Sequence, residues 1–200
     1  MTRTPISEVF NEDCMAGMAR YPDRFFDLAI VDPPYGIGAD KNKRGMGRRA
    51  GDERVRYKMG DWDGEIPQLD YFEEIKRVSV NQIIWGGNYF PLPPTKCFLV
   101  WDKKFGNDVS FADCEFAWTS FDATSKCFRK YPGDPNRIHP CQKPIKLYEW
   151  ILTHFGNGGG QDDRHSHRQP VQPYSGLQHG LRLLGMGNRQ GLFRSREQTV

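Results

Sequence analysis

The stretch that most constrains the fold is FDLAIVDPPYGIG, residues 26–38. Its first part, 26–31, is a short apolar run, which is typical of a strand buried on both faces within a parallel sheet. Two prolines follow, and because proline fixes φ and lacks an N–H donor, the strand must end there. Ligands of open α/β sheets bind just beyond the carboxyl ends of the strands. Asp32 is therefore predicted to lie at a ligand site.

The chain up to Gly156 alternates between strand-like and helix-like patterns. In QLDYFEEIKRVS the apolar residues recur at steps of three from Leu69 to Val78, as on one face of an amphipathic helix. Strands are predicted in 6–10, 26–31, 81–87, 97–103 and 114–121, and helices in 14–21, 68–79 and 142–155. This alternation predicts an α/β fold with a parallel sheet between layers of helices.

The last predicted helix lies in QKPIKLYEWILTHF and begins near Pro144, a residue favoured in the first turn of a helix. Its apolar face is predicted to carry Ile145, Tyr148, Ile151 and Leu152.

Length and composition are those of a folded globular chain. The 200 residues suffice for one domain with a substantial core, and contents of 38% hydrophobic and 26% charged residues argue against disorder. No apolar run approaches the roughly 20 residues of a membrane helix. The opening MTRTPISEVFNEDC lacks the apolar segment of a signal peptide. We therefore expect a cytoplasmic protein without a membrane partner.

The five cysteines, Cys14, Cys97, Cys114, Cys127 and Cys141, lie far apart in the sequence. Their odd number and unpaired spacing argue against a disulfide framework and against a zinc site. We expect all five to be small buried thiols, and no bound metal.

The four residues Asp32-Pro33-Pro34-Tyr35 can bind an amino group on a planar heterocycle. The carboxylate of Asp32 can accept a hydrogen bond from one N–H of an exocyclic amine. A carbonyl of the rigid Pro-Pro segment can accept the second N–H, and Tyr35 can lie flat against the ring. The nitrogen lone pair then points away from the ring. A simple strand-ending turn is the alternative interpretation.

The sequence around this slot resembles the DNA amino-methyltransferases, which modify adenine N6 or cytosine N4. Their hallmark is D/N/S-P-P-Y/F, and DPPY is its commonest adenine form. The run NEDCMAGMARYPDRFFDLAIVDPPYG and the segments IWGGNYF and HPCQKPIKLYEWIL are also similar, in the order that puts the catalytic half before the cofactor half. The likeness covers about residues 6–155, and these motifs together are specific. It implies a Rossmann-like methyltransferase sheet with S-adenosylmethionine as cofactor.

The resemblance implies a reaction on a base that has been flipped out of duplex DNA, with adenine N6 as the expected target. Asp32 and the Pro33 carbonyl would bind the amino group while the base stacks on Tyr35, and Pro34 completes the catalytic motif. The nitrogen would attack the methyl group of S-adenosylmethionine in line, with no covalent enzyme intermediate.

The family's pattern also places four residues of this sequence beside the cofactor: Asp13, His139, Gln142 and Lys143. For Asp13 the alternative is a helix N-cap. For the other three the alternative is a helix entry with solvated polar residues.

A basic segment follows the slot. Residues 41–58 carry eight Lys or Arg against two acidic residues, within a loop expected over 37–67. Since the resemblance implies double-stranded DNA as partner, we expect this loop to contact phosphates, which gives affinity without sequence choice. The expected contacts are Lys41, Lys43, Arg44, Arg48 and Arg49. A solvated insertion is the alternative.

Target recognition is expected within 105–138, and a homodimer is one option for the assembly.

Two other classes of protein stay open. An RNA or protein-amide methyltransferase would share the slot, although those enzymes more often carry Asn at its first position. A catalytically dead DNA-binding relic would keep the basic loop and lack the cofactor site. Binding of S-adenosylmethionine separates the relic from either enzyme, and duplex DNA tested against RNA separates the two enzymes.

Residues 157–200 change character abruptly. They contain no Lys, Ala, Ile, Trp or Cys but six Gln and eight Gly. They also lack the Asp-x-x-x-Gly-Ser loop that the family carries after the HPCQKP helix. Joining the last two bases of each codon to the first base of the next permits Asp-Thr-His-Thr-Gly-Ser-Arg-Ser in place of RHSHRQPVQ. The same shift turns Met186-Gly187 into an obligatory tryptophan.

We infer a frameshift near Gly158–Gly160. Residues 1–156 are then the catalytic part of a methyltransferase domain, and 157–200 are predicted to be a non-native, irregular tail. In the family the strands encoded by this region lie between the strand of 6–10 and the strand that ends at Asp32, so we expect the sheet to be cut there. We expect this chain to bind S-adenosylmethionine poorly or not at all.

Overall fold

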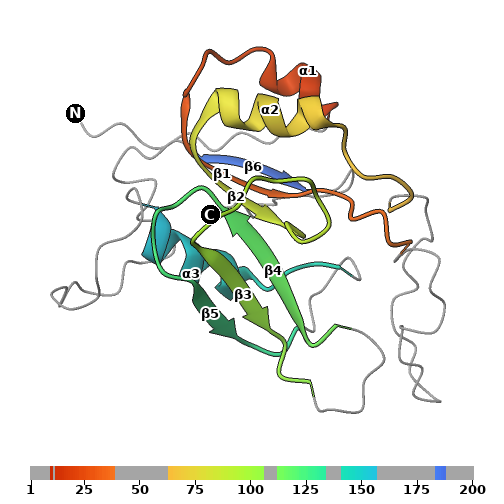
Figure 1. The fold of residues 1–200 in the computed structure, drawn as a ribbon, viewed down its shortest axis with the longest axis vertical. Helices are drawn as coiled ribbons and strands as arrows, with labels where there is room; N and C mark the ends of the chain where they lie inside the picture. The colour runs from red at the N-terminus through yellow and green to blue at the C-terminus, as the bar shows by residue number, and fades with distance from the viewer. Residues whose placement is uncertain are drawn as a thin grey trace, which may run out of the picture.

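The structure, a computed structural model, describes residue 10 and residues 12–38, 63–105, 112–133, 141–156 and 183–187, the last five as backbone only. Figure 1 shows the elements within these ranges. In chain order they are α1 (Cys14–Met18), β1 (Phe26–Asp32), α2 (Leu69–Val78), β2 (Ser79–Trp85), β3 (Phe98–Asp102), β4 (Cys114–Thr119), β5 (Lys126–Arg129), α3 (Ile145–Phe155) and β6 (Leu183–Gly187). None of these helices has the length and apolar character needed to cross a membrane.

The strands form one mixed sheet in the order β5-β3-β4-β2-β1-β6. β1 runs parallel to β2, with Ile30 beside Ile83, and β3 runs parallel to β5. β4 is antiparallel to both of its neighbours, β2 and β3. The α/β fold predicted from the sequence is confirmed, and the open sheet is compatible with a Rossmann-like fold. The prediction of parallel strands throughout is wrong for β4.

The reversal of β4 follows from its connection to β3. Residues 103–113 join the two strands, and a parallel pair would need a crossover of about a dozen residues or more, usually a helix. One reversed strand is a common variation of doubly wound sheets. As a consequence, the amino end of β4 lies at the same edge of the sheet as the carboxyl ends of β2 and β3.

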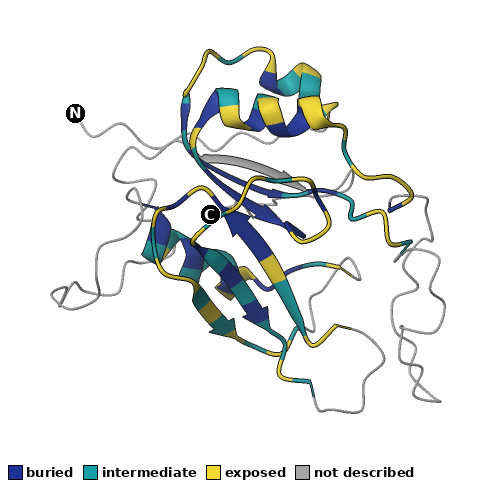
Figure 2. Ribbon diagram, viewed as in Figure 1, coloured by how far each residue is buried: buried dark blue, intermediate teal, exposed yellow. Residues whose placement is uncertain are grey.

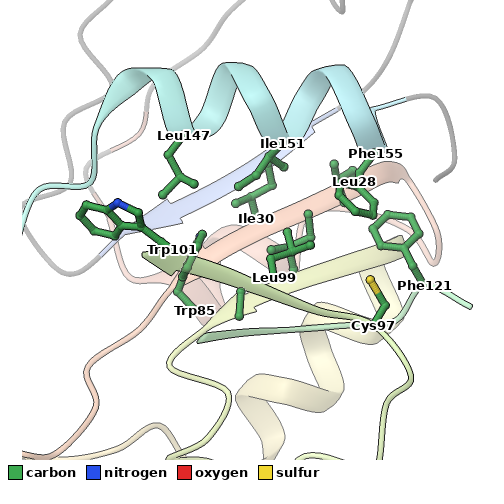
Figure 3. Packing of buried hydrophobic residues seen from close by; sticks show 12 residues of the cluster. Leu28, Ile30, Trp85, Cys97, Leu99, Trp101, Phe121, Leu147, Ile151 and Phe155 are labelled. Carbon is green, nitrogen blue, oxygen red and sulfur yellow. The ribbon is translucent and has the colours of Figure 1, made fainter. Parts of the chain in front are cut away.

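Helices cover both faces of the sheet, and the strands between them are the most deeply buried part of the chain (Figure 2). α1 and α2 pack on one face and α3 on the other (Figure 1). Side chains alternate along β1, so that Leu28 and Ile30 enter the core under α3 while Ala29 and Val31 enter the core under α1 and α2. Figure 3 shows the first of these cores. Burial on both faces confirms the prediction for this strand.

Two helices differ in detail from the predicted apolar faces. In α2, Leu69 is 63% exposed, whereas the apolar positions from Tyr71 to Val78 are buried. In α3 the buried side chains are Leu147, Ile151 and Phe155, spaced four apart, and they point toward the sheet in Figure 3. Ile145 is 64% exposed, so the prediction that it lies on the buried face is wrong.

The five cysteines all lie within the described residues and none of them forms a disulfide, but only Cys97 is buried. The prediction of five buried thiols is therefore wrong. Cys127 is exposed because it lies on β5, an edge strand, and Cys141 is exposed in the segment that precedes α3.

The tail contributes one strand, so the prediction that 157–200 is irregular throughout is wrong for β6. This strand pairs in parallel with β1, from Leu183 beside Leu28 to Gly187 beside Asp32. The edge of β1 away from β2 would otherwise present unpaired backbone N–H and C=O groups, which the apolar segment LRLLGM can satisfy. At these positions β6 therefore pairs with the edge of β1 where we expected the sheet to be interrupted. The strand predicted in 6–10 lies, apart from residue 10, outside the described residues.

Candidate active site at the carboxyl edge of the sheet

Four elements bring polar side chains to one edge of the sheet. Asp32 ends β1 and Lys103 follows β3, while Gly86, which follows β2, lies at the same edge without a side chain. Glu115 is the second residue of the reversed strand β4, and Lys143 precedes Pro144, the N-cap residue of α3. Parallel strands place their carboxyl ends together, and the reversal of β4 adds its amino end to them. This edge is where ligands bind in open α/β sheets.

The centre of the site is the ammonium group of Lys143. Its Nζ atom donates to Oδ1 of Asp32 at 2.6 Å and to the hydroxyl oxygen of Tyr35 at 3.2 Å. It also lies 3.2 Å from Oε2 of Glu115, whose other oxygen is 2.8 Å from Nζ of Lys103. The Tyr35 hydroxyl donates to Oδ1 of Asp32 at 2.8 Å. Two carboxylates and two ammonium groups therefore form one connected network.

Burial makes this network electrostatically strong. The side chain of Lys143 is 3% exposed. Burial alone would lower the pKa of Lys143, but the carboxylates of Asp32 and Glu115 outweigh it and hold that pKa well above its ordinary value. Burial also opposes ionisation of Glu115, yet Lys143 and Lys103 lower the pKa of Glu115 to about 2. Burial raises the pKa of Tyr35, so its hydroxyl keeps its proton at neutral pH.

A buried aspartate fixes the loop that follows β1. Oδ1 of Asp63 accepts hydrogen bonds from the backbone N–H groups of Tyr35 at 2.7 Å and Gly36 at 3.1 Å, and its carbonyl accepts one from Gly38. Gly36 has a φ of +70°, which glycine adopts without the strain a side chain would add. These three hydrogen bonds to Asp63 therefore fix the backbone conformation of the loop that contains Tyr35.

The ring of Tyr35 is held from two sides. It stacks on Tyr89 with a centroid distance of 5.2 Å and an interplanar angle of 19°. Its Cε1 atom lies so close to Gly86 that a Cβ added there would be 2.3 Å away. We expected this ring to lie flat against a base, and in this structure Tyr89 covers one of its faces. Tyr89 itself is 41% exposed, so it offers an aromatic surface at the rim of the site.

Replacing Gly86 by alanine is expected to destabilise the fold by about 2 kcal/mol or more, because the new methyl group would overlap the Tyr35 ring and because Gly86 has a φ of +72°. The measurement is urea unfolding of the full chain. Gly17→Ala in α1 is the matched control, since its Cβ would meet only ordinary contacts with Glu12, and alanine favours the helix. Equal free energies of unfolding for Gly86→Ala and Gly17→Ala would show that the close contact between Gly86 and the Tyr35 ring is not required for stability.

The structure brings together three of the predicted site residues, Asp32, Tyr35 and Lys143. The two residues between Asp32 and Tyr35 in the chain are also largely covered: Pro33 is buried and Pro34 is half-buried. Trp85 and Trp101 are buried in the core beside this group.

Of the other residues predicted to contact the cofactor or DNA, two lie within the described residues, Asp13 and Gln142. Asp13 is exposed and caps α1, with its Oδ1 accepting from the Ala16 N–H at 3.0 Å, as the alternative interpretation proposed. Gln142 is half-buried, next to Lys143 in the chain. The other predicted contacts, His139, Lys41, Lys43, Arg44, Arg48 and Arg49, lie outside the described residues.

The expected recognition region, 105–138, is in part built into the sheet. Its residues 114–119 and 126–129 are β4 and β5. The backbone of β4 is used on both sides, by β2 and by β3. Within the described part of this region, exposed side chains lie on the strands as well, such as Phe116 on β4 and Cys127 on β5.

Sequence reasoning missed Asp63, Tyr89, Lys103 and Glu115. Glu115 had a detectable signal, since it is the one acidic residue in the apolar strand segment CEFAWTSF, where a charge is unusual without a partner. Tyr89 lies within IWGGNYF, which was noted as a motif but given no role. Asp63 and Lys103 carry no local pattern that separates them from other surface charges.

Within the described residues, no group of three or more His, Cys, Asp and Glu side chains could hold a metal ion. Comparisons with protein-family models and with curated proteins found no match for this chain. The site is therefore interpreted from its own geometry.

Proposed function

We propose that residues 1–156 are the catalytic part of a site-specific DNA amino-methyltransferase that acts on adenine N6. The observation that carries this proposal is the placement of Asp32-Pro33-Pro34-Tyr35 at the carboxyl end of β1, with Oδ1 of Asp32 held by Lys143 and by the Tyr35 hydroxyl. Both of these hydrogen bonds go to Oδ1, so with respect to the described residues Oδ2 is the oxygen that remains for a ligand.

Such a site suits an exocyclic amino group. The Asp32 carboxylate can accept only hydrogen bonds while it is ionised, and therefore favours an N–H donor over a carbonyl. The Pro33 carbonyl can accept the second N–H, because its proline ring leaves the backbone rigid. An amino group bound in this way has its nitrogen lone pair free to react. The proton that the nitrogen loses has Asp32 as its nearest acceptor.

S-adenosylmethionine is the methyl donor of the enzymes that the sequence resembles, and it supplies a methyl group on a positively charged sulfur. The described residues of this chain do not fit that cofactor. The strand beside β1 is β6, a segment of the tail, and the carboxylate of Asp13 is used as a helix cap. We therefore propose that the frameshift removed the cofactor half and that the chain as it stands is impaired.

The experiment uses two forms of the protein. One is the chain as it stands, and the other, called here the frame-restored protein, is encoded by the gene with one base removed from the codons of Gly158–Gly160. Radiolabelled S-adenosylmethionine is incubated with each form and with duplex DNA or RNA. The proposal expects label in duplex DNA from the frame-restored protein. Label in RNA alone would favour the RNA enzyme, and binding to DNA without label would favour the relic.

A further inference from the structure

The amino group of Lys143 is surrounded by three acceptors and an aromatic ring. Its Nζ atom donates hydrogen bonds to Oδ1 of Asp32 and to the hydroxyl oxygen of Tyr35, and it forms an ion pair with Oε2 of Glu115 at 3.2 Å. It also lies over the ring of Trp85, 5.1 Å from the centroid. The contacts of Lys143 within the described residues therefore point to a role toward its neighbours Asp32, Glu115 and Tyr35.

We infer that Lys143 is the positioning residue of the site and that Glu115 is its anchor: together they fix Oδ1 of Asp32, so that Oδ2 is the oxygen presented to the amino group of the ligand. The last step of this inference rests on the proposed function. The role of Lys143 in organising Asp32, Glu115 and Tyr35 does not.

Asp32 needs such support because of its place in the fold. It is the last residue of β1, its side chain is 25% exposed, and the residues that follow it are prolines that donate no backbone hydrogen bond. A carboxylate there could turn freely about its side-chain bonds. The two hydrogen bonds from Lys143 and Tyr35 come from different elements and meet on the same oxygen, which defines its orientation.

Glu115 is needed for a second reason. Burying an ammonium group is strongly unfavourable unless a negative charge lies next to it. If Asp32 were the only such charge, the ion pair with Lys143 would weaken whenever Asp32 binds a ligand. Glu115 keeps one contact with Lys143 that is independent of Asp32 and is itself balanced by Lys103 at 2.8 Å. The charges of Asp32, Glu115, Lys103 and Lys143 sum to zero. Lys143 therefore stays in place when Asp32 changes partners.

The test on the chain as it stands compares Lys143→Met with Lys143→Arg, and with Lys96→Met as the matched control. Lys96 is also paired with an aspartate, Asp122, but its side chain is 76% exposed. The full chain is labelled with ¹³C in its Glu side-chain carboxyl groups and titrated by NMR, with Glu115→Gln to assign the signal. In the unmodified chain Glu115 is expected to titrate with a midpoint of about 2, because Lys143 and Lys103 lower its pKa.

In Lys143→Met the midpoint of Glu115 is expected to rise by about one pH unit or more, because an opposite charge in direct contact is lost. Lys143→Arg and Lys96→Met are expected to keep the low midpoint. The effect on stability has a defined sign. Ionised Glu115 stabilises the fold above its ordinary pKa of 4.5, and this contribution is lost as pH falls toward 2. In Lys143→Met this pH dependence is expected to shrink. An unchanged midpoint in Lys143→Met would overturn the inference.

Lys143→Gln serves if the methionine variant does not fold, since glutamine is neutral but can still donate hydrogen bonds, and the same rise is expected. In the frame-restored protein, Lys143→Met is expected to lower kcat by about 100-fold with little change in KM for DNA, as misplacement of a catalytic group does. A rise in KM at unchanged kcat would overturn the positioning role. If the unmodified frame-restored protein transfers no methyl group, the proposed function fails, and the titration alone decides the role of Lys143.

Discussion

Replacing Asp32 by alanine in the frame-restored protein is expected to abolish measurable methyl transfer, a loss of at least about 10³-fold, while binding of duplex DNA is retained. The substitution removes the acceptor that orients the amino group and takes up its proton. It leaves unchanged the basic segment 41–58, which we expect to contact DNA. The measurements are the transfer of labelled methyl groups and a DNA-binding titration on the same preparation.

Two further variants sharpen this prediction. Asp32→Asn keeps the shape of the side chain and one acceptor oxygen, and Asn is allowed at this position of the family's motif, so partial activity is expected. Asp122→Ala is the matched control, because that aspartate pairs with Lys96 at the surface, with a side chain that is 81% exposed. Full activity of Asp32→Ala would contradict the assignment of the slot. A loss of DNA binding along with activity would point to a folding defect instead.

Restoration of the reading frame is expected to create a binding site for S-adenosylmethionine. The chain as it stands is expected to show no binding by calorimetry. The frame-restored protein is expected to bind with a Kd of about 1 μM, corresponding to about 8 kcal/mol of binding free energy. The physical reason is that the displaced frame permits an Asp-x-x-x-Gly-Ser loop where the present frame has RHSHRQPVQ. Glycine lets a loop backbone approach a ligand closely.

The matched control removes a whole codon, Gly159, rather than one base. That deletion shortens the same glycine run but keeps the present frame, and it is expected to leave the chain without cofactor binding. Micromolar binding by the chain as it stands would contradict the frameshift argument. It would also mean that β6, which lies beside β1 with Gly187 next to Asp32, takes part in a site for S-adenosylmethionine that differs from the family's.

Local patterns in the sequence predicted most of the elements but not how they are joined. The apolar run before Pro33 is enough to define β1, and the period of QLDYFEEIKRVS is enough to define α2. Strand direction is not encoded in such patterns. The reversal of β4 depends on the length of the connection from β3, and that reversal is what brings Glu115 into the site.

The same limit explains the errors in the tail and in α3. LRLLGM is apolar but lacks strand-type alternation, and its part from Leu183 onward belongs to β6, where β1 offers an unpaired edge. In α3, two apolar faces compete in the sequence, and the sheet selects the one that carries Leu147 and Ile151. In both segments tertiary contacts decide what the local pattern leaves open.

The candidate site was predictable in part for a related reason. Asp32 and Tyr35 are adjacent in the chain, so their motif is visible in the sequence. Lys143 is far from them in the chain, and only the packing of α3 against the sheet brings it to Asp32. The resemblance of HPCQKP to the family's motif pointed to a site for Lys143, but not to Asp32 as its partner there.

The measurement that tests the account most directly is nucleoside analysis of duplex DNA after incubation with the frame-restored protein and S-adenosylmethionine. The DNA is digested to nucleosides, and the methylated products are separated and weighed by mass spectrometry, with Asp32→Ala as the control. We expect N6-methyladenine, formed by the unmodified protein and absent with Asp32→Ala. N4-methylcytosine in its place would retain the slot but contradict the adenine assignment. DNA without any methylated amino group, from a protein that binds both duplex and cofactor, would contradict the central claim that Asp32-Pro33-Pro34-Tyr35 holds an amino group for methylation.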